Sequence, residues 1–125
     1  MSHMVKIRAK ITDLEALRRA VSKMGGTFHE NRTQYTTYGS SRNECTHAIS
    51  FPSTRMEVGV VKQEDGSYTL ECDNMLYSTI GQNGNKLLAY YEAEKAYMEG
   101  FNMGYVVCEP YEVKDELIVE MEVEV

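Results

Sequence analysis

The sequence has no tryptophan, only two prolines and three cysteines, and it has no long apolar run. An odd number of widely spaced cysteines without a Cys-x-x-Cys motif excludes the disulfide framework of a small secreted domain, so free thiols in a reducing compartment are expected. No segment approaches the ~20 consecutive apolar residues of a membrane span. The first residues lack the apolar core of a signal peptide. We therefore expect a cytoplasmic protein without a membrane partner.

The chain also lacks an excess of positive charge. It carries 13 basic and 19 acidic residues, a formal net charge of −6. Neutralising a nucleic-acid backbone requires clustered lysine and arginine, so no direct binding to that backbone is expected. An acidic surface remains compatible with a basic protein partner. The 125 residues have an ordinary globular composition and are expected to form one domain, residues 1–125.

The beginning of the chain predicts a strand followed by a helix. Apolar residues alternate with Lys6, Arg8 and Lys10 over residues 5–11, which is typical of a half-buried strand with a basic outer face. Thr12-Asp13-Leu14-Glu15 then matches a capping box at the start of a helix. Apolar residues follow at helical spacing, and two glycines after Met24 end the pattern.

The middle of the chain predicts a meander of three strands. Residues 29–44 are polar and are expected to form a loop with a short strand near residues 35–38. Alternating segments, separated by turn residues, then predict three consecutive strands at residues 45–51, 56–62 and 68–73.

A second helix is expected from about residue 85 to 101, followed by strands at 105–108 and 117–125. The expected order is β-α-β-β-β-α-β-β, which indicates an α+β fold with a mainly antiparallel sheet and two helices on one face. The last strand has alternating glutamates and the first has alternating basic residues. Because opposite charges attract across neighbouring strands, we expect the first and last strands to be adjacent.

Several short motifs resemble a family of unknown function named after a conserved chloroplast open reading frame, domain of unknown function 1257, with cyanobacterial and phage members. The resemblance covers nearly the whole chain and includes the opening Met-Ser-His, the strand–helix segment that ends at Gly26, and the stretches Cys45–Ile49, Glu57–Val61 and Asp65–Tyr68. Lys114-Asp115-Glu116 departs from the Asp-Gly turn of the family. The resemblance implies a small intracellular, phage-related accessory protein, located in the host cytoplasm if phage-encoded, and it carries over no catalytic residue.

The loop before the second helix is the first candidate site. Gly81 and Gly84 allow a close backbone approach, Lys86 adds a cation, and a helix N-terminus suits an anion. The spacing does not match a phosphate-binding Walker loop, however, and Asn83 or Asn85 is also a good N-cap. Both interpretations, an anion site and a plain helix start, remain open from the sequence.

Other residues are candidates for the same ligand or for separate sites. Arg55 and tyrosines, Tyr90 among them, are candidate contacts for a phosphate-bearing ligand, and Tyr35 and Tyr38 lie near arginines, as in a base-stacking site or a protein-binding hot spot. Cys45 and His47 share one face of a strand, but a structural zinc site needs about four ligands. We therefore expect no metal and no cofactor.

Three functions remain open. The first is a non-catalytic accessory protein that binds a protein partner and forms a homo-oligomer. The second is a protein that binds or sequesters a nucleotide or another phosphate-bearing ligand. The third is a metal-dependent enzyme, for which the sequence shows no catalytic constellation.

Overall fold

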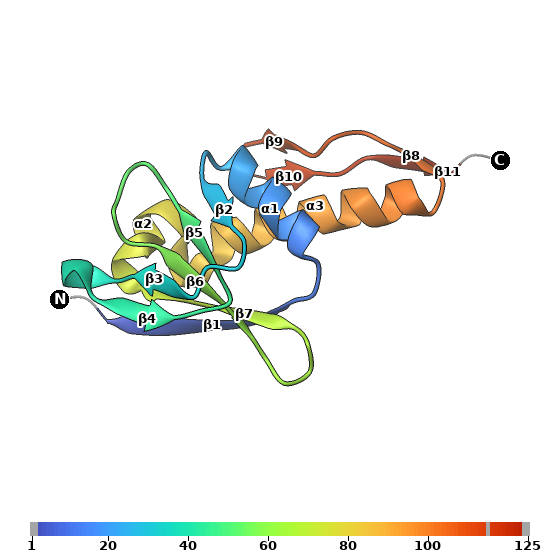
Figure 1. The fold of residues 1–125 in the computed structure, drawn as a ribbon. Helices are drawn as coiled ribbons and strands as arrows, with labels where there is room; N and C mark the ends of the chain where they lie inside the picture. Colours follow the sequence, from blue (N-terminus) through green and yellow to red (C-terminus); the bar gives the residue numbers. More distant parts are fainter. Residues whose placement is uncertain (1–2, 115, 124–125) are drawn as a thin grey trace.

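The computed structural model describes residues 3–114 and 116–123. A five-stranded antiparallel sheet has the strand order β1-β7-β6-β5-β2. Three helices accompany it (Figure 1), and three further strand pairs lie outside it, which confirms an α+β fold with a mainly antiparallel sheet. The elements are β1 (Met4–Ile11), α1 (Leu14–Lys23), β2 (Thr27–His29), β3 (Gln34–Thr36), β4 (Arg42–Glu44), β5 (His47–Ser50), β6 (Val58–Lys62), β7 (Tyr68–Asp73), α2 (Tyr77–Ile80), α3 (Asn85–Asn102), β8 (Tyr105–Val107), β9 (Tyr111–Val113), β10 (Glu116–Ile118) and β11 (Met121–Val123).

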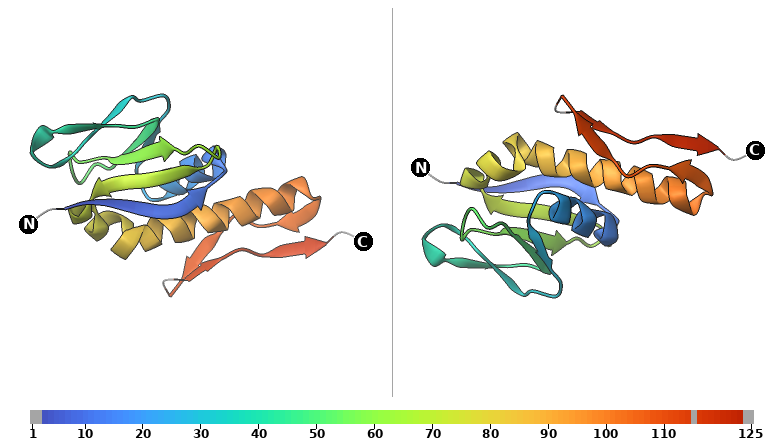
Figure 2. Two further views of the ribbon diagram at one scale, coloured as in Figure 1. Left: turned by 90° about the horizontal axis from the view of Figure 1, so that it is seen from below. Right: turned by 90° about the horizontal axis from the view of Figure 1, so that it is seen from above.

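The core lies between the helices and one face of the sheet. Alternating residues of the strands point to this face because successive side chains of a strand point to opposite sides. The helices cover it with their buried apolar residues, and both views of Figure 2 show them on this side of the sheet. The buried residues of this core include Ile7, Ile49, Val58, Val60, Leu70 and Cys72 from the sheet and Leu17, Val21, Leu76, Ile80, Leu87 and Tyr91 from the helices.

The opposite face of the sheet is partly covered by the β3–β4 hairpin. Tyr35 of β3 is fully buried, and its ring lies against Gly59 of β6, where an added Cβ would be 2.3 Å from the ring. The Tyr35 hydroxyl donates to Glu71 Oε1 on β7 at 3.1 Å. Glu71 in turn pairs with Lys6 of β1 at 3.9 Å. The glycine in the middle of the sheet therefore makes room for the hairpin's anchor.

The first and last strands are not neighbours, so this part of the sequence prediction is wrong. β1 is an edge strand that pairs with β7, whereas β11 pairs with β8 in a separate two-stranded ladder. On the basic outer face of β1, Lys6 pairs with Glu71 of β7 rather than with a glutamate of the last strand. The expected strand at 117–125 is also interrupted: it consists of β10 and β11, and residues 124–125 lie outside the described residues.

Two helix predictions are also corrected. The structure contains a third helix, the short α2, in the segment between the meander and α3. The N-cap of α1 is Asp13, whose side chain accepts from the Ala16 amide at 3.0 Å. The capping-box pattern therefore located the helix start within one residue, but the carboxylate of Asp13 caps it rather than the Thr12 hydroxyl.

The C-terminal part of the chain extends away from the sheet. β8 pairs with β11 and β9 pairs with β10, which makes one long two-stranded ribbon interrupted in its middle. The ribbon runs beside α3, and its distal half and the C-terminal half of α3 project beyond the sheet (Figure 1). We call residues 101–123 the C-terminal arm and the remainder of the structure the body.

Candidate functional site

The glycines before α3 have structural roles. Gly84 is the N-cap of α3 in a left-handed conformation, with φ +73°, and an added Cβ would be 2.6 Å from Ile7 Cδ1. Gly81 has φ +88°, and the side-chain oxygen of Asn85 fills the space above it. Neither Asn83 nor Asn85 is the N-cap, and no side chain caps the helix. The close approach that the two glycines allow is therefore used by Ile7 and Asn85 of the chain itself.

Three of the sequence candidates meet in a groove beside the start of α3. Asn85, Lys86 and Tyr90 line a cavity of about 390 Å³, together with Ala89, Glu112 of β9 and Leu117 of β10. The Tyr90 hydroxyl donates to Glu112 Oε2 at 3.0 Å. Burial and this hydrogen bond raise the pKa of Tyr90. Within the described residues Lys86 makes no ion pair, so the groove combines one cation, one carboxylate and an aromatic ring.

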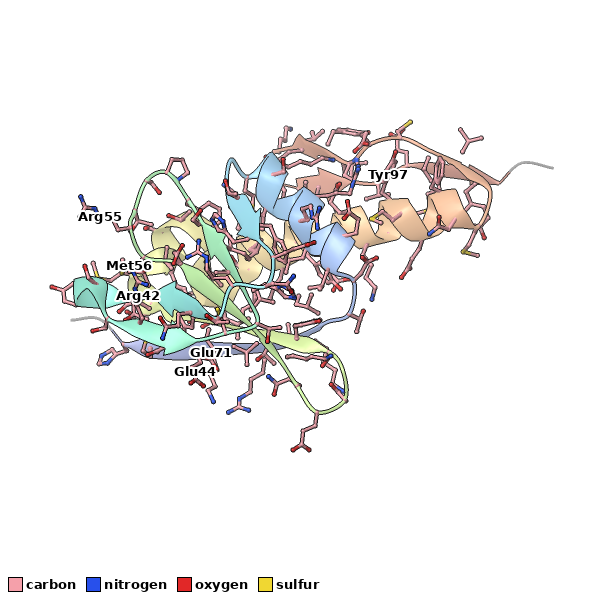
Figure 3. The ribbon with its side chains drawn as sticks, in the orientation of Figure 1. Arg42, Glu44, Arg55, Met56, Glu71 and Tyr97 are labelled. Atoms are coloured by element: carbon pink, nitrogen blue, oxygen red, sulfur yellow. The ribbon has the colours of Figure 1, made fainter. Side chains whose placement is uncertain are left out.

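The other ligand candidates are dispersed. Arg55 lies on the exposed loop between β5 and β6 and points away from the body (Figure 3). Tyr38 is exposed in a 3-10 turn after β3, with 61% of its surface accessible. Tyr35 is fully buried, and desolvation raises the pKa of its hydroxyl, so its ring is not available for stacking on a ligand. These three residues and the groove at Lys86 do not form one site.

Cys45 and His47 are engaged separately within the protein. The Cys45 thiol donates to the Arg32 carbonyl at 3.0 Å, and burial raises the pKa of this thiol to about 11. His47 Nδ1 accepts from the Asn31 amide at 2.9 Å, and desolvation lowers the pKa of the ring. Across residues 3–114 and 116–123, no three His, Cys, Asp or Glu side chains are grouped as metal ligands.

One contact resembles the pairing of a nucleophile with a base. His29 Nε2 lies 2.8 Å from Ser50 Oγ, between neighbouring strands β2 and β5. Activation of a serine also requires an orienting group behind the histidine. In the part of the chain that the structure describes, no hydrogen bond joins His29 to a carboxylate, and the groove at Lys86 is not lined by this pair. The contact therefore reads as a cross-strand hydrogen bond.

A charge cluster joins the arm to the body. Glu94 of α3 is only 1% exposed and accepts from Arg19 Nε at 2.9 Å and from Lys23 Nζ at 2.8 Å, both on α1. Glu109, between β8 and β9, binds the same two cations at 2.8 and 2.7 Å. Hydrogen bonds from Lys23 and Arg19 lower the pKa of Glu109 to about 2. Arg19 also stacks 5.1 Å from the centre of the Tyr97 ring. Two acids and two bases are thus balanced where the middle of the ribbon meets α1.

The arm itself has an unusual surface that the sequence prediction missed. Nine large apolar side chains are exposed among the described residues, and six of them lie in the arm: Phe101, Met103, Val106, Tyr111, Val113 and Met121. Residues 104–125 also contain seven of the 19 acidic residues and one of the 13 basic residues, which leaves twelve of each in residues 1–103. The whole net charge of −6 therefore resides in the C-terminal segment. A count of charge by segment is the signal that would have shown this.

Comparison with known proteins finds no match to a family model, to a curated protein or to a solved structure. Among the described residues, no helix is both long and apolar enough to cross a membrane. The residues of this chain alone therefore carry the functional assignment.

Proposed function

We propose that this chain is a small, non-catalytic, phage-related accessory protein of the cytoplasm, and that it binds a basic protein partner through its C-terminal arm. A single observation carries the proposal: the exposed apolar side chains and the net negative charge both gather in the arm. Protein interfaces combine an apolar centre with a polar rim, and contiguous exposed apolar surface marks such sites.

The charge of the arm indicates the kind of partner. Complementary charge raises association rates and excludes partners of like charge. The body is neutral overall, since residues 1–103 contain equal numbers of acidic and basic residues. An arm that is both acidic and partly apolar fits a partner with an apolar patch bordered by lysine and arginine.

The resemblance of the sequence to the family of unknown function also supports the proposed accessory role. It implies an intracellular protein without a catalytic residue to carry over. Glu94 of α3 and Glu109 of the arm are both held in ion pairs with Arg19 and Lys23, which gives these carboxylates a structural role in fixing the arm to the body.

The test compares two matched pairs of exposed apolar residues. The arm variant is Phe101→Ser with Met103→Ser, side chains that are 67% and 66% exposed. The control is Tyr38→Ser with Met75→Ser on the body, which are 61% and 49% exposed. Affinity capture from cells, quantified by mass spectrometry, is expected to lose the partner at least about tenfold with the arm variant, or ~1.4 kcal/mol. Equal recovery with wild type, arm variant and control contradicts the proposal.

A second candidate function is the binding of a small phosphate-bearing ligand in the groove at the start of α3. The observation that favours it is the cation of Lys86 beside Tyr90 in a cavity of about 390 Å³. Thermal shift measurements with a panel of nucleotides and inorganic phosphate test this function. A stabilisation that Lys86→Ala abolishes supports it, and no stabilisation by any of these ligands contradicts it.

A further inference from the structure

Two edge strands of this protein are open and complementary to each other. β1 has β7 on one side, and among the described residues no strand pairs with its other side along Met4–Ile11. Within residues 3–114 and 116–123, β11 likewise has only β8 as a partner. An open edge presents unpaired backbone N–H and C=O groups that another strand can bind.

The sequences of the two strands alternate in matching order. On β1 the basic Lys6, Arg8 and Lys10 point to the outer face of the sheet, while the apolar residues between them point to the core. Lys6 pairs with Glu71 at 3.9 Å and Lys10 with Asp65 at 3.0 Å, and among the described residues Arg8 makes no ion pair. Around β11 the glutamates at 120 and 122 alternate with the apolar residues Met121 and Val123. If the two strands lie side by side, acidic residues face basic ones on one side of the sheet and apolar residues meet on the other.

Charged side chains on an edge strand usually prevent pairing, and here they prevent only pairing of like with like. Two β1 strands side by side would place lysine and arginine opposite each other, and two β11 strands would place glutamate opposite glutamate. Both symmetric pairings are therefore disfavoured. The mixed pairing is the one in which the charges attract.

The shape of the molecule excludes this pairing within one chain and permits it between chains. β1 and β11 belong to separate ladders. The start of β1 and the end of β11 lie at opposite ends of the molecule in the ribbon views (Figures 1 and 2). The ribbon of one copy, projecting from its body, can therefore approach the free edge of the sheet in the next copy without bringing the two bodies together.

We propose that the partner of the arm includes a second copy of this chain, and that β11 of one copy adds to the open β1 edge of another. The inference rests on the proposed function, because it names one partner of the arm. The contact joins two different surfaces, so repetition gives a closed ring, of which a reciprocal dimer is the smallest, or an open chain of subunits.

Charge reversal tests the pairing directly. One variant is Arg8→Glu with Lys10→Glu, and the other is Glu120→Lys with Glu122→Lys. Light scattering after size exclusion is expected to show multiples of the 14.3 kDa chain for wild type and about 14.3 kDa for each variant alone. Because the altered strands are complementary to each other, a mixture of the two variants is expected to recover the larger assemblies. This recovery also shows that each variant is folded.

Matched controls leave both edges intact. Arg42→Glu with Arg55→Glu makes the same change of net charge as the first variant, and Glu64→Lys with Glu92→Lys matches the second. All four residues are exposed. Both controls are expected to assemble like wild type. Raising the salt from about 0.1 M to 1 M shortens the screening length from about 10 Å to 3 Å and is expected to shift wild type towards the monomer.

A wild-type protein that remains a monomer at all accessible concentrations overturns the inference, and so do assemblies that both charge reversals leave unchanged. Neither result affects the proposed function. The capture experiment with the variant at Phe101 and Met103 depends on apolar contacts and not on the strand edges, so it reports separately on whether the arm binds another protein.

Discussion

Gly59 provides a test of how the β3–β4 hairpin is attached to the sheet. A Cβ added at this position would lie 2.3 Å from Cε1 and 2.4 Å from Cδ1 of the Tyr35 ring. Contacts this short require the ring or the strand to move. Tyr35 is fully buried and held by its hydrogen bond to Glu71, so the ring has little freedom to adjust.

The expected effect of Gly59→Ala on the free energy of unfolding changes sign when Tyr35 is replaced by alanine. Overpacking a buried site costs about 1–3 kcal/mol. Without the ring, alanine in the middle of a strand stabilises the fold relative to glycine by roughly 0.5–1 kcal/mol, because a chain with alanine loses less conformational freedom on folding than a chain with glycine. We therefore expect Gly59→Ala to destabilise wild type and to be neutral or stabilising in the Tyr35→Ala background.

Urea unfolding of the four proteins of this double-mutant cycle measures the coupling between the two positions. The two effects add to an expected coupling of roughly 1.5–4 kcal/mol. Tyr35→Ala by itself is expected to cost about 3–5 kcal/mol, as for other large buried aromatic residues. If Gly59→Ala lowers the free energy of unfolding equally in both backgrounds, the ring does not rest on Gly59 and the placement of the hairpin is wrong.

Three further predictions concern the charge cluster and the thiols. Glu94→Ala is expected to lower the free energy of unfolding, measured in urea, by about 2–4 kcal/mol; the loss is somewhat smaller than for a fully buried pair because the two cations of Glu94 are about a third exposed. Glu109 is 55% exposed, so Glu109→Ala is expected to cost about 0–1 kcal/mol, and equal costs for the two variants contradict the buried role of Glu94. The pKa of Glu109 is lowered from 4.5 to about 2, so its contribution to stability is present above about pH 4.5 and is lost as the pH falls towards 2. Glu109→Gln is expected to flatten the dependence of the unfolding free energy on pH over this range, and an unchanged dependence is evidence against the ion pairs. A maleimide at neutral pH is expected to label the native protein once, at the exposed Cys108, because burial raises the pKa of the Cys45 thiol to about 11 and that of the Cys72 thiol to about 12. Mass spectrometry of the native and the urea-unfolded protein shows whether the one label becomes three.

The meander was predictable because its signals are local. The three consecutive strands have alternating side chains and are joined by short turns, and the structure places them as β5, β6 and β7 in an antiparallel order. The start and end of α1 and of α3 were predictable for the same reason. Each depends on residues that are neighbours in sequence, such as the Thr12–Glu15 pattern, which located the start of α1 within one residue, and the glycines after Met24.

The pairing of β1 was not predictable, because the alternation of charge shows which face is polar and not which strand lies beside it. The basic face of β1 does meet an acidic residue, but this residue is Glu71 of β7. On the core side of the same pair, Ile7 faces Leu70 and Val5 faces Cys72. Burial of these apolar residues outweighs exposed ion pairs, which contribute little.

The candidate site was predictable only where helical spacing determined it. Asn85, Lys86 and Tyr90 meet in one groove because they lie on adjacent turns of α3. Arg55 and Tyr38 belong to separate loops, whose positions depend on the fold as a whole. The burial of Glu94 was also hidden, since the helix pattern gives no sign that Arg19 and Lys23 of α1 lie opposite it.

Two glutamates of the C-terminal segment, Glu109 and Glu120, have separate roles. Glu109 is bound by Arg19 and Lys23, so its charge is compensated within the protein and serves to fix the arm. Glu120 lies across the ribbon from this cluster, since its carbonyl accepts from the Cys108 amide at 3.2 Å, and its side chain accepts from the neutral hydroxyl of Tyr111 at 2.5 Å. A hydrogen bond from a neutral group leaves the negative charge uncompensated. A change at Glu109 is therefore expected to act on stability, and a change at Glu120 on recognition of the partner. Stability and recognition can thus be altered independently.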